Sequence, residues 1–244
     1  MRSVMGILKT TRKVTEEEKA FQLENLKRLE SDFDATKAMG VKKYSDAMQF
    51  IYDKKRRCFV VVKGPEETFK VKNPYIIDFD QVKDAYVEVE EFWTEGPRKF
   101  ELKAPQQYRL KMGDFDKVFW RYNIYMNFKT THPYAEHIRY QMNYNTIITR
   151  VSGLRVMAKR GLELNGEFRG NEIKKQAERV AEFAEHQQKA VGKEKMLELA
   201  THTRPEGMLN RMAEDFFEQK FVDKMNAVSK HLDRAYRICE VLEK

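Results

Sequence analysis

The feature that most constrains the fold is an alternation of apolar and polar residues near the middle of the chain. Large side chains at Trp120, Tyr122, Ile124, Met126 and Phe128 alternate with Arg121, Asn123, Tyr125 and Asn127. Successive side chains of a strand point to opposite faces of a sheet. The run therefore predicts a strand with one face on a hydrophobic core and the other face turned away from that core.

Other segments between residues 44 and 152 also have the patterns of strands. An alternating run at 86–92 predicts a second long strand, and residues 48–52 and 58–62 flank a polar stretch and predict a hairpin. Shorter strands are predicted at 68–72, 75–77, 138–142 and 146–151, and a long connection containing Gly and Pro at 94–116.

An N-terminal helix is predicted from a capping signal. Thr15 is followed by three glutamates, and Glu18 stands three residues after it, the pattern of a capping box. The helix is expected to end near residues 39–40, where a glycine occurs. Its apolar stripe, expected to pack on the sheet, comprises Leu23, Leu26 and Phe33, with Phe21 and Leu29 at the flanks.

Two long amphipathic helices are predicted in the last third of the chain. Residues 171–190 and 206–242 carry apolar residues at helical spacing, and residues 153–170 are expected to connect the sheet to them. Pro205 suits the first position of the second helix.

These elements predict an α+β protein. Its expected parts are an N-terminal segment and helix (1–43), a strongly bent antiparallel sheet of about seven strands (44–152), and a C-terminal region with a pair of long helices (153–244).

Composition limits the class of protein and the compartment. A net charge of +8 and a pI near 9.2 are compatible with an acidic partner but also occur in ordinary proteins. The only cysteines, Cys58 and Cys239, form neither a disulfide framework nor a metal motif, which favours a reducing compartment. No apolar run approaches the length of a membrane span, and the first eight residues are too short for a secretory signal, so a cytoplasmic location is expected.

Two separated motifs indicate a family resemblance. The first is Asn73-Pro74-x-Ile76-Ile77-Asp78-Phe79-x-Gln81-Val82, and the second is His132-Pro133-Tyr134-x-x-His137-Ile138-Arg139. With the acidic strand at 86–92 and the aromatic strand at 122–128, they resemble a widespread family of uncharacterised bacterial proteins. Members commonly carry an N-terminal zinc ribbon ahead of this β-rich region and a helix at the end, and some occur in phage or mobile-element contexts.

The resemblance covers roughly residues 20–150, and it departs from the family at the zinc ribbon. The first cysteine here is Cys58, inside a predicted strand, so the ribbon's paired cysteines have no counterpart and its function is not carried over. The strand order is also similar to that of bacterial pleckstrin-homology-like domains. That similarity implies a bent barrel and no particular function.

Candidate catalytic groups are sparse. The sequence has no phosphate-binding loop, nucleophile elbow or His-Glu-x-x-His motif. His132 and His137 are the nearest approach to a metal pair, but no third ligand stands at the usual spacing. The acidic group Asp78, Asp80 and Asp84 is expected to satisfy backbone donors in a turn. No catalytic residue, cofactor or metal is therefore predicted; an enzyme would need a pocket that gathers these residues.

Two surfaces are candidates for binding. A basic hairpin tip, which could attract phosphates, comprises Lys54, Lys55, Arg56 and Arg57, with Lys42 and Lys43 nearby. A wide apolar helical face comprises Phe216, Phe217, Phe221, Met225, Val228 and Leu232; it is expected to pack within the chain by default, or on a second copy or another protein. The sequence thus favours a non-catalytic binding or adaptor protein that engages a protein partner or itself through the C-terminal helices. The alternative is a nucleic-acid-binding accessory protein that uses the basic surface.

Overall fold

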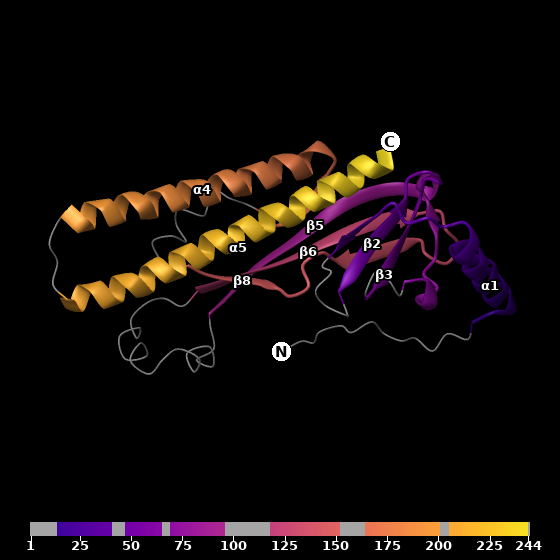
Figure 1. The fold of residues 1–244 in the computed structure, drawn as a ribbon, viewed down its shortest axis with the longest axis horizontal. Coiled ribbons are helices and arrows are strands. Elements are labelled where there is room, and N and C mark those ends of the chain that lie inside the picture. The colour runs from indigo at the N-terminus through magenta and orange to yellow at the C-terminus, as the bar shows by residue number, and fades with distance from the viewer. Residues whose placement is uncertain are drawn as a thin grey trace.

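The computed structural model describes residues 14–40, 47–64, 69–95, 118–151, 164–200 and 205–243. Its elements occur in the order α1 (Glu16–Ser31), β1 (Lys37–Gly40), β2 (Met48–Asp53), β3 (Cys58–Lys63), η2 (Lys70–Lys72), β4 (Ile77–Asp78), η3 (Phe79–Gln81), β5 (Val82–Glu95), β6 (Val118–Thr130), β7 (His137–Gln141), β8 (Ile147–Val151), β9 (Gly166–Arg169), α4 (Asn171–Ala200) and α5 (Pro205–Glu243). The predicted α+β class is confirmed, with one helix before the strands and two long helices after them (Figure 1).

The described strands form two antiparallel sheets. The first sheet has the order β1-β2-β3-β4, and we call it sheet A. The second has the order β7-β6-β5-β9, with β8 also paired to β6, and we call it sheet B. Seven of the described strands, β2 to β8, lie within residues 44–152, the number predicted there, but they are divided between two sheets, which β1 and β9 join from outside that range.

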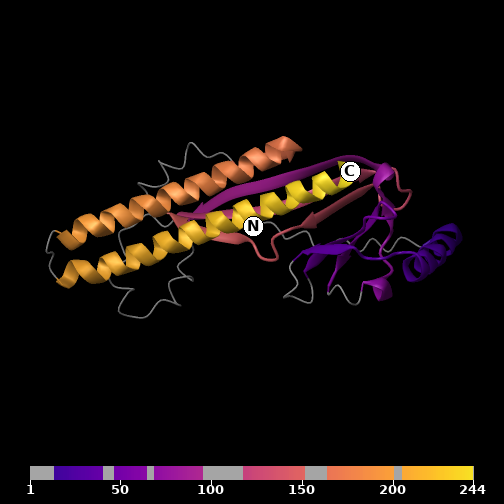
Figure 2. The same cartoon turned by 45° about the horizontal axis from the view of Figure 1, so that its top comes forward.

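The long β5–β6 strand pair runs through the hydrophobic core that both sheets share. Its register sets Val87 opposite Met126 and Val89 opposite Ile124, and all four side chains are buried. Near one end Phe128 stacks on Phe50 of sheet A, with ring centroids 5.7 Å apart. Toward the other end, α5 runs along the ribbon (Figures 1 and 2). The alternation seen in the sequence thus builds one continuous core that is shared by both sheets and the helices.

The helices α4 and α5 form an antiparallel hairpin that closes this core. The buried side of α4 consists of Ile173, Ala177, Val180 and Ala184. The buried side of α5 consists of Val222, Met225, Val228, Leu232, Ala235, Ile238 and Cys239. This spacing is the one predicted for two amphipathic helices, and α5 begins at Pro205 as expected.

Helix α1 differs from its prediction in length and in its buried side. Thr15 caps it as expected, since its Oγ1 accepts a hydrogen bond from the Glu18 backbone at 3.2 Å. The helix ends at Ser31 rather than near residue 40, because the following chain pairs with β2 as strand β1. Leu23, placed in the predicted apolar stripe, is 57% exposed, whereas Leu29 is fully buried.

Two other segments differ from their predictions. Residues 70–72 of the predicted strand at 68–72 form a 3-10 turn, and the predicted connection 153–170 contains the strand β9. Strand β1 lies before residue 44 and β9 lies after residue 152, yet both pair with strands of the middle region. The sheets therefore cross both predicted domain boundaries. Among the described helices, none is long and apolar enough to cross a membrane.

Candidate functional site

The basic hairpin tip is built around a buried aspartate. Asp53 ends β2 and is fully buried; its Oδ1 accepts hydrogen bonds from the backbone N–H groups of Lys55 and Arg56 at 2.9 and 3.1 Å. Its Oδ2 accepts from the backbone of Asp34 at 2.9 Å. Burial raises the pKa of Asp53, but these hydrogen bonds outweigh it and the pKa is lowered. The tip is thus a structured turn held by a charged carboxylate.

The four cations of the tip are not equivalent. The Arg56 guanidinium pairs with Asp53 at 3.2 Å. Arg57, which adopts a left-handed backbone conformation (φ 52°), pairs with Asp80 at 3.7 Å and lies over the Phe79 ring. Lys54 and Lys55 are exposed. Lys42 and Lys43 lie outside the described residues, so the anion contact predicted for them stays a prediction.

The acidic group at the turn is divided among separate ion pairs. Asp78 pairs with Arg28 of α1, and Asp80 with Arg57. Asp84 pairs with Lys129 at 3.8 Å and with Arg169 at 3.3 Å. Besides these pairs, Asp78 takes part in a capping box with Gln81, in agreement with the expected role of satisfying backbone donors. These carboxylates therefore serve as structural partners of three different parts of the fold.

The two histidines of the second motif lie in different environments. His132 is 1% exposed, and its Nδ1 accepts a hydrogen bond from the Tyr134 backbone at 3.2 Å, which stabilises the turn. Desolvation lowers the pKa of His132. His137 is exposed on β7. Within the described ranges, no group of three or more His, Cys, Asp or Glu residues could hold a metal ion.

The two family-like motifs contact each other and receive α1. The Thr131 backbone donates to the Gln81 carbonyl at 2.8 Å, and the Tyr75 and His132 rings are 5.1 Å apart. Asn25 of α1 donates to the side chain of Asn73 at 2.8 Å, and its Oδ1 accepts from the backbone of Ile76 at 3.0 Å. Among the described residues, the motifs thus form a docking site for α1, which is an architectural role.

The apolar face predicted on the last helix falls into two parts in the structure. Met225, Val228 and Leu232 are fully buried in the core, which is the intramolecular packing that the sequence analysis took as the default. Those three residues therefore offer no surface to a partner. Phe216, Phe217 and Phe221 lie on α5, but their side chains are outside the described residues.

The side of sheet B that faces away from the core carries a polar network. Arg139 of β7 pairs with Glu88 and Glu90 of β5 at 3.0 and 2.9 Å and lies 3.6 Å from the centre of the Tyr125 ring. The alternation of β5 and β6 predicted that this side would be polar. It could not predict the pairing, because β7 contributes the cation across the sheet.

Three buried polar atoms on β7 and α5 were not found from the sequence. Tyr140, His231 and Arg234 each have a buried polar atom without a hydrogen-bond partner among the described residues. Helical spacing alone left His231 as a scattered residue and gave Arg234 no role. The two cysteines are also buried, and burial raises the pKa of Cys58 to about 11 and that of Cys239 to about 12, so both thiols are protonated at neutral pH.

Comparison with family models, with curated proteins and with solved structures finds no match to this chain. The family resemblance and the similarity to pleckstrin-homology-like domains accordingly remain predictions.

Proposed function

We propose that the protein is a non-catalytic protein-binding module whose contact surface is the distal half of the α4–α5 hairpin, meaning residues 190–200 of α4 and 205–221 of α5. The observation that carries this proposal is the projection of the hairpin beyond sheet B. In both ribbon views, the ends of α4 and α5 that face the α4–α5 connection extend past the strands (Figures 1 and 2). The sheet therefore covers only the proximal half of α5.

The helical repeat adds a second argument. Phe221 and Phe217 precede Met225 by four and eight residues, which sets them within about a quarter turn of its side of the helix. Phe216 precedes Met225 by nine residues, or about two and a half turns, so it belongs to the opposite side. Leu209 and Met212 share the side of Phe216 at a spacing of seven and four residues.

Next to the distal half of the hairpin, the side of α5 that carries Phe216 reaches solvent at Asp223. Asp223 lies seven residues after Phe216, on the same side of the helix, and it is exposed. We call Leu209, Met212 and Phe216 the outer stripe. A single neighbouring helix covers one side of another, and we propose that the outer stripe is the side of α5 that a partner covers.

A second copy of the chain is the simplest partner. Two helical hairpins that pack against each other form a four-helix bundle, and a two-fold axis lets the same stripe serve both copies. The distal half of the hairpin would then gain the third and fourth helices that it lacks.

The test is the mass of the full chain in sedimentation across a concentration series, together with the fluorescence of a dye that binds exposed apolar surface. We expect a reversible dimer, and Phe216→Ser should weaken it at least about tenfold, since truncating an aromatic anchor costs about 2 kcal/mol or more. Val71→Ser is the matched control, because Val71 is 87% exposed and lies outside the hairpin.

Each outcome bears on the proposal. If the chain is a monomer and Phe216→Ser abolishes dye binding, the outer stripe is an exposed apolar surface and its partner is a different protein. A monomer that binds no dye, with Phe216→Ser unchanged, would overturn the proposal.

The second candidate, a nucleic-acid-binding accessory protein, is favoured by the exposure of Lys54 and Lys55 on the hairpin tip. Arg56 and Arg57 have carboxylate partners, which lowers the charge available to phosphates. Gel shifts at two salt concentrations separate the candidates, because binding through phosphate contacts weakens steeply with salt. The absence of salt-sensitive binding would exclude this function.

A further inference from the structure

The outward side of sheet B changes in character along the strands. In the half nearer sheet A, Arg139 pairs with Glu88 and Glu90, and its guanidinium covers the Tyr125 ring at 3.6 Å. Farther along β5, Phe92 is 39% exposed. It is the only exposed aromatic side chain in the part of the chain whose burial the structure describes. An aromatic ring that is covered near sheet A therefore has an accessible counterpart toward the other end of sheet B.

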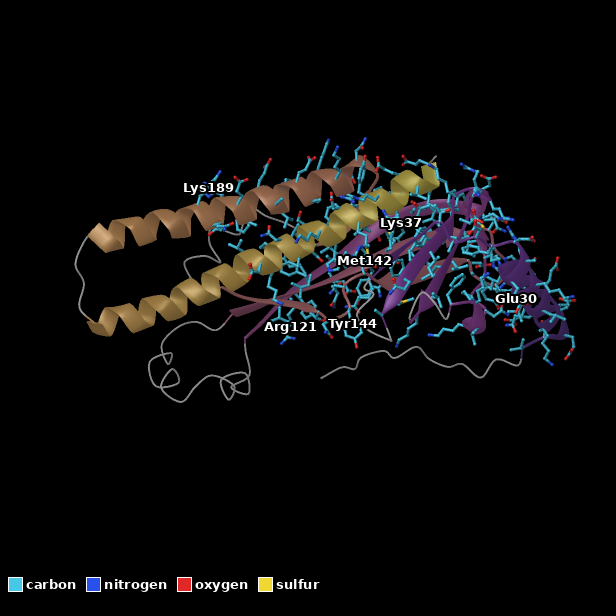
Figure 3. All side chains as sticks on the ribbon, in the orientation of Figure 1. Glu30, Lys37, Arg121, Met142, Tyr144 and Lys189 are labelled. Carbon is cyan, nitrogen blue, oxygen red and sulfur yellow. The ribbon has the colours of Figure 1, made fainter. Side chains whose placement is uncertain are left out.

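The strand register fixes the neighbours of Phe92. Phe92 of β5 is directly opposite Arg121 of β6, and Arg121 is opposite Ile148 of β8. Directly opposite side chains of an antiparallel sheet have Cβ atoms about 4.5–5.5 Å apart. Arg121 and Ile148 are half-buried, and Figure 3 shows Arg121 toward the end of sheet B that lies away from sheet A. We call these three residues the Phe92 row.

The next row of positions repeats the combination of phenylalanine and arginine. Because side chains alternate between the faces of a sheet, the next positions on the side of Phe92 are Thr94, Phe119 and Arg150, which the register also pairs. Position 119 is diagonal to position 92, at about 7–8 Å. At these described strand positions, the two rows together have two arginines, two phenylalanines and no acidic residue.

This combination is chemically complementary to single-stranded nucleic acid. Unpaired bases stack on aromatic rings, and guanidinium groups donate hydrogen bonds to phosphates. The net charge of +8 also favours the approach of a polyanion. An acidic peptide would match the arginines, but it would leave the accessible ring of Phe92 without a stacking partner.

We propose that the two rows form a binding surface for single-stranded nucleic acid, in which one base stacks on Phe92 and a neighbouring phosphate binds Arg121. The diagonal position of Phe119 supplies a second stacking platform for the same strand. The surface belongs to sheet B. It is separate from the α4–α5 hairpin and from the basic tip of the β2–β3 hairpin, so it goes beyond both functions considered above.

The experiment measures fluorescence anisotropy of a short labelled thymidine oligonucleotide and of an abasic strand of equal length, which keeps the phosphates and lacks the bases. Both are titrated with the full chain over a series of salt concentrations. The variants are Phe92→Leu, Arg121→Gln and the matched charge control Lys54→Gln, since Lys54 is exposed on sheet A. Phe92 is also exposed, so Phe92→Leu keeps the test valid if Arg121→Gln fails to fold.

The wild type and Lys54→Gln should bind the oligonucleotide at least about fivefold more tightly than the abasic strand, because only the former can stack. Phe92→Leu should lose about fivefold or more on the oligonucleotide and almost nothing on the abasic strand. Arg121→Gln should weaken both complexes and lower the salt slope by about 0.7, the value of one phosphate contact on a single strand.

Three results would overturn the proposal. Equal affinity for the two strands, unchanged in Phe92→Leu, would show that charge alone attracts them. A loss confined to Lys54→Gln would assign the binding to the hairpin tip. No binding by the wild type at low salt would exclude nucleic acid from both surfaces. The sedimentation test of Phe216→Ser is independent of all three results, so the proposed dimer and this surface can fail separately.

Discussion

Helices α1 and α5 dock on the sheets by different physical means. Among its described side chains, helix α5 contributes seven buried apolar residues, whereas α1 buries only Asn25 and Leu29 within its helical turns. Hydrogen bonds of Asn25 to Asn73, Pro74 and Ile76, and the ion pair between Arg28 and Asp78, hold α1 in place. The Phe21 ring lies 5.2 Å from the His132 ring and 5.1 Å from the Tyr134 ring, and Leu29 packs into a small apolar cluster with residues of sheet A.

This difference shows when an amphipathic pattern in the sequence can predict which side of a helix is buried. Apolar burial scales with area and tolerates small shifts, so α5 has a wide stripe that is visible in the sequence. A hydrogen-bonded interface depends on single polar residues in one geometry. The predicted stripe of α1 accordingly included exposed Leu23 and omitted Asn25.

The largest effect is expected on the apolar side of this comparison. Leu232→Ala should lower the free energy of unfolding by about 2–5 kcal/mol, because it leaves a cavity in the shared core. Urea denaturation of the full chain measures it. Arg237→Ala, an exposed change on the same helix, should stay within about 0.5 kcal/mol. A similar loss in both variants would show that α5 is not docked by its apolar side.

A pH experiment compares the histidines of the two interfaces. The pKa of His231 in the folded state, about 4, lies below its ordinary value of 6.5, so the unfolded chain binds the proton more tightly. Stability is therefore complete above pH 6.5 and is lost as the pH falls toward 4, by about 3 kcal/mol from this residue.

The measurement is denaturation across that pH range at constant ionic strength. His231→Leu should flatten the loss. The pKa of His132 is also lowered, so His132→Leu should remove a further part of the loss, and that part should appear in probes of α1. If neither variant changes the pH profile, burial does not govern acid sensitivity at these two interfaces.

On the hydrogen-bonded side, Asn25→Ala should cost about 1–3 kcal/mol, because the buried N–H of Ile76 loses its acceptor. Hydrogen exchange should accelerate in α1 before it does in α5. Leu23→Ala is the matched apolar control and should have almost no effect, since Leu23 is exposed. If Leu23→Ala cost more stability than Asn25→Ala, the apolar stripe predicted from the sequence would be the docking side of α1.

The smallest effect is expected at the ion pair of Arg28 with Asp78. Both side chains are more than a third exposed, so a double-mutant cycle with Arg28→Met and Asp78→Asn should give a coupling below about 1 kcal/mol. The coupling should weaken with salt. A larger, salt-independent coupling would show that this ion pair, rather than Asn25, contributes most of the free energy that docks α1.

Several parts of the fold follow from local pattern alone. The period of two residues placed β5 and β6 and their core side, the helical period placed α4 and α5, and Thr15 placed the start of α1. These predictions succeeded because each pattern reflects the geometry of neighbouring residues in one element.

The remaining features required distant partners. Strand β2 decided where α1 ends, and β5 recruited β9 from a segment predicted to be a connection. The core took Met225, Val228 and Leu232 out of the predicted binding face.

By itself, then, the sequence determined which segments form helices and long strands and which side of each is apolar, because those properties depend on residues within a few positions of one another. The tertiary structure alone decided the division into two sheets, the hydrogen-bonded docking of α1 and the burial of polar atoms of Tyr140, His231 and Arg234. Each of these depends on which distant surfaces meet, and neither periodicity nor composition encodes the position of a single polar atom against a partner far along the chain.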